Sequence, residues 1–116
     1  MRKNKLNNRK TTIDKIVFGS KKEASAYPIL KLMEKSGKIR DLQLQVPFTL
    51  MEGYRGVDGK KVRDMTYVAD FTFFDNEKNK KRVLDVKGFK TEVFKIKEKL
   101  FNKKMLDNGI KIEYEI

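Results

Sequence analysis

The chain has 116 residues and carries 28 lysine and arginine residues against 16 aspartate and glutamate residues, a net charge of +12. Such an excess attracts polyanions, of which nucleic acid comes first and an anionic membrane surface second, although a merely solvated lysine-rich surface is the alternative. Because cysteine and histidine are both absent, disulfides, thiolate or imidazole metal sites and histidine-dependent hydrolases are excluded. Carboxylates, lysines, tyrosines and hydroxyl groups remain for any chemistry.

The N-terminal segment is basic and almost free of apolar residues. Residues 1–12 are therefore predicted to form a flexible arm, which is either simply disordered or lies along phosphates. No apolar run follows that would make a signal peptide, and no segment approaches the roughly 20 apolar residues that span a bilayer. We expect a soluble intracellular protein whose single domain covers residues 13–116. The cations of the arm are Arg2, Lys3, Lys5, Arg9 and Lys10.

The first helix has a start signal, an apolar stripe and a stop signal. After residues 13–18, which form either a short strand or an extended lead-in, Ser20 and Glu23 have the spacing of a capping box. Pro28 is expected to kink the helix or to shorten its first half, and Gly37 is expected to end it. The stripe consists of Ala24, Tyr27, Leu30 and Met33.

Three strands are predicted next. Alternating apolar residues indicate a long strand over 39–50, in which Pro47 lies near an edge or a bulge. Glycines within residues 53–60 predict a hairpin. The most strongly apolar strand covers 62–74, and the next strand covers 81–87. The residues expected on one face of the 62–74 strand are Tyr67, Ala69, Phe71 and Phe73.

A second helix is predicted over 91–107, followed by a last strand over 110–116. We expect its apolar face to contain Val93, Ile96 and Leu100, widened by Phe94, Phe101 and Met105. The order α-β-β-β-α-β predicts an α/β fold with a mixed central sheet flanked by helices.

Two acids and a lysine stand within apolar strands. Asp70 has apolar neighbours in one strand, and Asp85 and Lys87 share one face of the next. A hairpin between these strands would bring Asp70 beside them. Such a cluster is costly unless a cation or an anionic ligand satisfies it, and paired carboxylates suit Mg²⁺ and phosphodiester hydrolysis. The alternative is an ion pair between Asp85 and Lys87 on an exposed edge; a second Asp-x-Lys triplet at 58–60 is interpreted as a turn.

Two further polar residues have two interpretations each. Glu23 is either a helix cap or a third acid of the metal centre. Gln45 either lines the same site or is an exposed strand residue.

The pattern resembles the PD-(D/E)XK nuclease superfamily, and in particular a family of its short phage-encoded members related to Holliday-junction resolvases. Four blocks carry the resemblance in order, namely residues 20–24 (SKKEA), 42–45 (LQLQ), 67–71 (YVADF) and 85–89 (DVKGF). The resemblance implies a restriction-endonuclease-like core, and it covers residues 13–107. Ala69 stands where the superfamily's name has proline, a position that varies widely.

By this resemblance the metal ligands are Asp70, Asp85, Glu23 and the backbone carbonyl of Val86, and Lys87 is the catalytic lysine. The implied activity is that of an Mg²⁺-dependent endodeoxyribonuclease, with Mn²⁺ able to substitute, in phage recombination or replication. The implied partner is DNA, cut by a homodimer in the cytoplasm of a bacterial host, with branched junctions among the possible substrates. The alternative from another class is an accessory protein that binds nucleic acid without cutting it.

Lysines of the second helix bear on both functions. Lys90, Lys95 and Lys97 follow the Asp-x-Lys strand directly. They either form a solvated face or contact phosphates beside the site.

Overall fold

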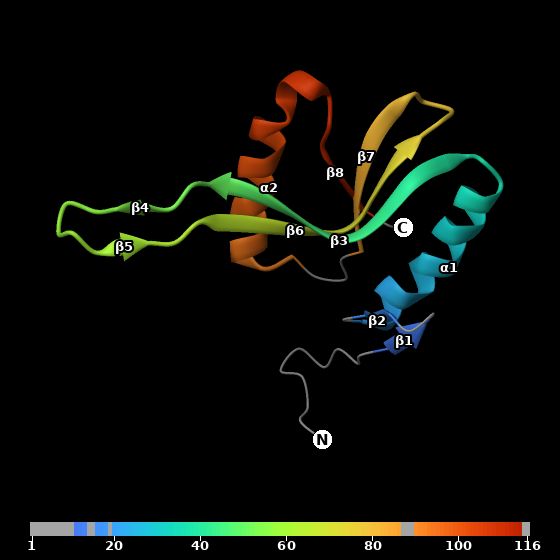
Figure 1. Ribbon diagram of the computed structural model, residues 1–116, viewed down its shortest axis with the longest axis horizontal. Helices are drawn as coiled ribbons and strands as arrows, with labels where there is room; N and C mark the ends of the chain where they lie inside the picture. The colour runs from blue at the N-terminus through green and yellow to red at the C-terminus, as the bar shows by residue number, and fades with distance from the viewer. Residues whose placement is uncertain (1–10, 14–15, 19, 87–89, 115–116) are drawn as a thin grey trace.

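The computed structural model describes residues 11–13, 16–18, 20–86 and 90–114. The chain is mixed α/β, as predicted, with one central sheet and two helices, α1 (Lys21–Lys35) and α2 (Glu92–Lys104) (Figure 1). The sheet has the strand order β3 (Ile39–Met51), β6 (Met65–Asp75), β7 (Lys80–Asp85) and β8 (Ile112–Tyr114). The shorter elements are β1 (Thr11–Ile13), β2 (Ile16–Phe18), β4 (Tyr54–Arg55), β5 (Lys61–Val62) and the 3-10 turn η1 (Leu106–Asn108).

The strand directions make the sheet mixed. β3, β6 and β7 pair antiparallel, and β8 joins β7 in parallel after the α2 crossover. The core therefore has the predicted order α-β-β-β-α-β, with the β1–β2 hairpin before it and the β4–β5 hairpin inserted between β3 and β6. Because Thr11 and Thr12 lie in β1, the boundary predicted for the arm at residue 12 falls within a strand. Neither described helix is long and apolar enough to cross a membrane.

Helix α1 begins and ends at the predicted signals. The Ser20 hydroxyl accepts the Glu23 N–H at 3.1 Å, which satisfies one of the donors left open in the first turn. At the other end Gly37 has φ 84°, and the Lys38 N–H donates to the Met33 carbonyl at 3.0 Å, as in a Schellman motif. The helix continues through the exposed Pro28 to Lys35, so a shortened first half is not what forms.

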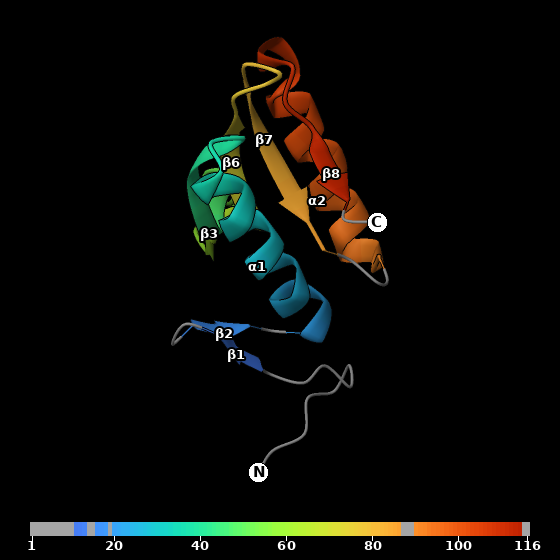
Figure 2. The same ribbon diagram turned by 90° about the vertical axis from the view of Figure 1, so that its right-hand side faces the viewer.

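The two helices cover opposite faces of the sheet at β7. Neighbouring residues of a strand point to opposite faces, and Val83 packs in the α2 cluster whereas Leu84 packs against the α1 cluster. On β6, Ala69 packs under α2 and Phe71 under α1, although they are only two residues apart. The expectation of one shared face for this strand is therefore wrong. The long strand twists, which turns its two halves towards different helices. Figure 2 shows β7 between these two helices.

Helix α2 buries the aromatic part of its predicted apolar face and leaves the aliphatic part exposed. Phe94 and Phe101 are 8% and 0% exposed. Val93, Ile96 and Leu100, which were expected to lead the buried face, are 61%, 54% and 38% exposed. Burying the two aromatic rings removes more apolar area from water than burying the aliphatic stripe, so the aromatic side faces the sheet.

Arg82 joins three strands of the sheet. Its guanidinium donates to Asp75 Oδ2 at 3.0 Å and to both carboxylate oxygens of Glu113 at 2.8 Å. Asp75 also accepts the N–H groups of Glu77 and Lys78, which closes the turn after β6. The Lys78 N–H, followed by Arg82, lowers the pKa of Asp75, and Arg82 lowers the pKa of Glu113.

We expect Arg82→Met to reduce the free energy of unfolding by about 2 kcal/mol at pH 7, because it leaves two carboxylates without their shared donor. The pKa values of Asp75 and Glu113 are lowered in the folded state. The stabilisation by Arg82 is therefore complete above the unfolded-state pKa values of about 4, and it is lost as pH falls through the lower folded-state values. Urea denaturation of both proteins from pH 7 to pH 2.5 measures this. An unchanged difference at pH 2.5 would contradict the ionic account.

Candidate functional site

Asp70 and Asp85 face each other across neighbouring strands. Phe71 pairs with Leu84 in the β6–β7 register, so the next pair along is Asp70 with Asp85. The Asp70 Oδ2 accepts the Val86 N–H at 2.8 Å, just beyond the end of β7. The predicted pairing of these two acids is therefore present in the fold.

The surroundings of the pair disfavour two negative charges. Asp85 is 0% exposed. Burial, and after it the negative charge of Asp85, raises the pKa of Asp70 to about 8. The hydrogen bond from the Val86 N–H lowers this pKa, whereas the charge of Glu23 raises it. The Asp70 carboxyl is thus largely protonated at neutral pH unless a cation balances the charge.

Tyr67 holds Asp85 in place. Its hydroxyl donates to Asp85 Oδ2 at 2.6 Å, and the ring is 3% exposed. Burial and this hydrogen bond raise the pKa of Tyr67 above its usual range, so the hydroxyl stays a donor. The sequence pattern placed Tyr67 only on an apolar face of its strand, so its polar role was not predicted. The available signal was that a buried tyrosine hydroxyl needs a hydrogen-bond partner.

Glu23 and Gln45 bring two further elements to the site. Glu23 lies in the first turn of α1, is 6% exposed, and accepts a hydrogen bond from Gln45 Nε2. Because Gln45 lies across from Asp70 on β3, this hydrogen bond places the Glu23 carboxylate beside the acid pair. At the helix start the Glu23 backbone N–H donates to the Ser20 hydroxyl, while the Glu23 side chain binds Gln45 of the site.

Gln45 lies across from Asp70 on β3. The flanking pairs are Leu44 with Phe71 and Val46 with Ala69, which leaves Gln45 opposite Asp70. Its φ of 54° is in the left-handed region, which costs a non-glycine residue roughly 1–2 kcal/mol. Such strained positions concentrate at functional sites. Here the strain coincides with the side chain that binds Glu23.

The donor set fits a hard divalent cation that keeps most of its waters. Within the described ranges no three acids are arranged closely enough to hold a metal ion by themselves. Mg²⁺ is commonly bound through one or two carboxylates plus water and substrate oxygens, so the facing pair of Asp70 and Asp85 is sufficient in number. A cation would favour the ionised form of Asp70 against the burial and the charge of Asp85 that raise its pKa. Lys87, the predicted catalytic lysine, lies outside the described residues.

The predicted phosphate-binding lysines differ in how they are engaged. Lys90 Nζ lies 3.6 Å from Glu98 Oε2 and 4.0 Å from the centre of the Tyr114 ring, so it is held within the fold. Lys95 is exposed and lies 3.3 Å from Glu92 within the same helix, and Lys97 is half-buried. The cations predicted in the arm, Arg2, Lys3, Lys5, Arg9 and Lys10, lie outside the described residues.

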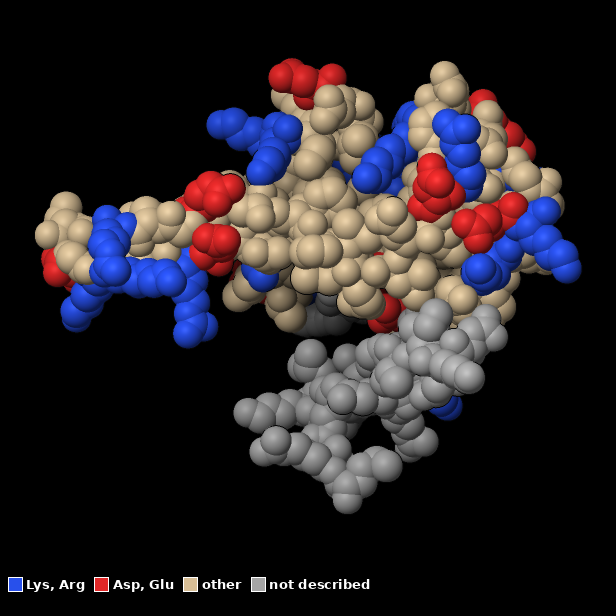
Figure 3. Space-filling model, viewed as in Figure 1, with Lys and Arg blue, Asp and Glu red and all other residues tan. Residues whose placement is uncertain are grey.

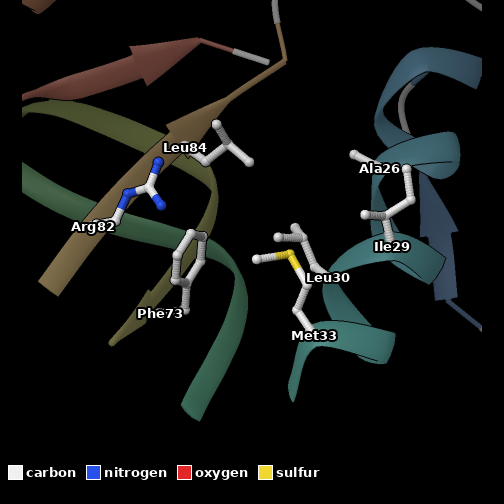
Figure 4. Close-up of a pocket in the computed structure, with 7 residues that line it drawn as sticks. All are labelled: Ala26, Ile29, Leu30, Met33, Phe73, Arg82 and Leu84. Atoms are coloured by element: carbon white, nitrogen blue, oxygen red, sulfur yellow. The ribbon is translucent and has the colours of Figure 1, made fainter. Parts of the chain in front are cut away.

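A pocket between α1 and the sheet is distinct from the acid pair. Its lining is apolar apart from Arg82, which Asp75 and Glu113 already bind (Figure 4). It therefore offers neither an acid nor a base for chemistry. The lining residues are Ala26, Ile29, Leu30, Met33, Phe73, Arg82 and Leu84.

Comparison with known proteins gives one match. A family model described as "Protein of unknown function (DUF1064)" matches residues 3–114, nearly the whole chain. No curated protein and no solved structure matches the chain.

Proposed function

The chain belongs to the DUF1064 family, and we propose that it is an Mg²⁺-dependent endodeoxyribonuclease. The observation that carries the proposal is the facing pair of a half-buried Asp70 and a fully buried Asp85 at the end of β7, where burial and the charge of Asp85 raise the pKa of Asp70. The net charge of +12 and the resemblance to PD-(D/E)XK nucleases support DNA as the substrate.

Each residue around the pair has a separate part in this chemistry. Asp70 and Asp85 would hold the cation, with the Val86 N–H fixing one carboxylate and the Tyr67 hydroxyl fixing the other. Gln45 would keep Glu23 directed at the site. When bound, Mg²⁺ supplies charge neutralisation on the phosphate and acidifies a water molecule. In the proposal Lys87 stabilises the negative charge that develops on the phosphate.

Incubation of the purified protein with DNA of different structures tests the proposal. The substrates are a four-way junction, a linear duplex and a single strand, each with Mg²⁺, with Mn²⁺ or with EDTA. We expect cleavage of at least one substrate with either metal and none with EDTA. Absence of cleavage on every substrate with both metals would refute the nuclease function.

A non-cleaving DNA-binding protein is the second candidate. The observation that favours it is the lack, within the part of the chain that the structure describes, of three acids arranged to hold a metal ion. Under this alternative the same incubation gives salt-sensitive binding and no products.

A further inference from the structure

The β4–β5 ribbon, residues 53–64, projects from the central sheet at one end of the long axis (Figure 1). Its base is closed by the Gly53 N–H, which donates to Asp64 Oδ1 at 2.5 Å. Its tip is closed by a second set of bonds, in which Arg55 Nη1 donates to the Gly59 carbonyl at 2.9 Å. The ribbon is thus a shaped element rather than an irregular loop.

One face of the ribbon concentrates positive charge. Arg55 stands directly opposite Lys61, and cross-strand partners lie on the same face. Arg63 follows Lys61 by two residues, the spacing at which extended chain returns to the same side. All three residues are exposed, and none takes part in an ion pair found among the described residues. Like charges directly opposite each other destabilise a ribbon, and a bound polyanion would offset the repulsion between Arg55 and Lys61.

Among the described residues, the two acids of the ribbon bind its backbone and form no ion pair with these cations. Asp64 accepts the Gly53 N–H at the base, and Asp58 Oδ1 accepts the Lys60 N–H in the turn at 3.0 Å. In the space-filling view basic side chains gather along one side of the projecting ribbon (Figure 3). The cationic face is therefore available to a polyanion.

The other face is apolar and uncovered. Tyr54, which pairs with Val62, is 54% exposed, and Val57 at the tip is fully exposed. A lone two-stranded ribbon is marginally stable in water, and this one buries little apolar area against the sheet to compensate. A partner with a groove that binds the cations and covers the apolar side would stabilise the ribbon.

We propose that the β4–β5 ribbon is a docking arm for double-stranded DNA, with Arg55, Lys61 and Arg63 on phosphates flanking a groove. A two-stranded ribbon fits the major groove, about 12 Å wide. The inference rests on the proposed function only in taking DNA as the ligand. The ribbon continues directly into β6, and Asp70 lies five positions after Met65, which is roughly 17 Å of extended chain. The arm therefore holds the duplex about five base pairs from the acid pair.

Binding of a 24-base-pair duplex in EDTA tests the arm without any cleavage. The test variant is Arg55→Ala, Lys61→Ala and Arg63→Ala together. We expect its affinity at 0.1 M salt to fall on the order of 100-fold, and the slope of log K against log salt to decrease in magnitude by about 2.7, which is about 0.9 for each of three phosphates. The matched control removes three exposed lysines at the opposite end of β6, namely Lys35, Lys38 and Lys78. Its affinity should change less than about threefold.

A charge-retaining variant distinguishes a loss of positive charge from misfolding as the cause of weaker binding. Arg55→Lys, Lys61→Arg and Arg63→Lys together should keep the affinity within a few-fold of the unsubstituted protein, with the same circular dichroism spectrum and melting temperature. Equal losses in the alanine variant and the control would overturn the proposal. So would an alanine variant whose affinity falls for single-stranded DNA or RNA but not for the duplex. Because cleavage is not measured, duplex binding through the arm without nuclease activity would leave this inference standing and refute the proposed function.

Discussion

Asp85→Asn is expected to reduce metal-dependent DNA cleavage by roughly 10³-fold, because it removes one of two carboxylate charges that hold the cation. Asparagine keeps an oxygen that can accept the Tyr67 hydroxyl, which lies 2.6 Å from Asp85 Oδ2, so the fold should persist. Initial cleavage rates with Mg²⁺ measure the loss, and the urea midpoint and duplex affinity in EDTA measure fold and binding.

The chain provides a matched control for this substitution. Asp58 belongs to a second Asp-x-Lys triplet, and its side chain only accepts the Lys60 N–H in the ribbon turn. Asp58→Asn should cleave within a few-fold of the unsubstituted protein. If the two variants cleave equally well, Asp85 is not a ligand of a catalytic metal. If Asp85→Asn is unfolded, the residue is structural.

Asp70→Asn is expected to make the metal-free protein more stable at pH 9 and to abolish most of its stability change between pH 5 and pH 9. Burial and the charge of Asp85 raise the pKa of Asp70 from 3.8 to about 8 in the folded state. Between these values the folded chain binds a proton that the unfolded chain has lost, so this group's contribution to the free energy of unfolding decreases as pH rises. The decrease ends above about pH 8, when both states are ionised.

Urea denaturation in EDTA at pH 5, 7 and 9 measures this effect. The unsubstituted protein should lose a few kcal/mol of stability from Asp70 over that range, and the variant should not. Adding Mg²⁺ at pH 9 should restore stability to the unsubstituted protein more than to Asp70→Asn, since the cation then replaces the proton. A variant that is less stable than the unsubstituted protein at pH 9 would show that Asp70 is not electrostatically strained.

Local sequence patterns were enough to predict the local features of this protein. The start of α1 at Ser20 and its end at Gly37 depend on caps formed within a few residues, so the sequence pattern predicted them. The class and order of the core elements followed from apolar periodicity. The facing of Asp70 and Asp85 was also predictable, because consecutive antiparallel strands pair and their register brings nearby residues together.

Which faces are buried and which side chains meet depends on how the helices pack against the sheet. The stripe that contains Val93 and the side that contains Phe101 fit helical periodicity equally well. The side that packs against the sheet is the aromatic one. The twist of β6 divides its apolar residues between two clusters, which strict alternation does not foresee. The contact of Glu23 with Gln45 joins residues 22 positions apart, and the hydrogen bond from Tyr67 to Asp85 spans 18 positions. Local patterns carry no information on such pairs, since their distance is fixed by how helix and strands pack together.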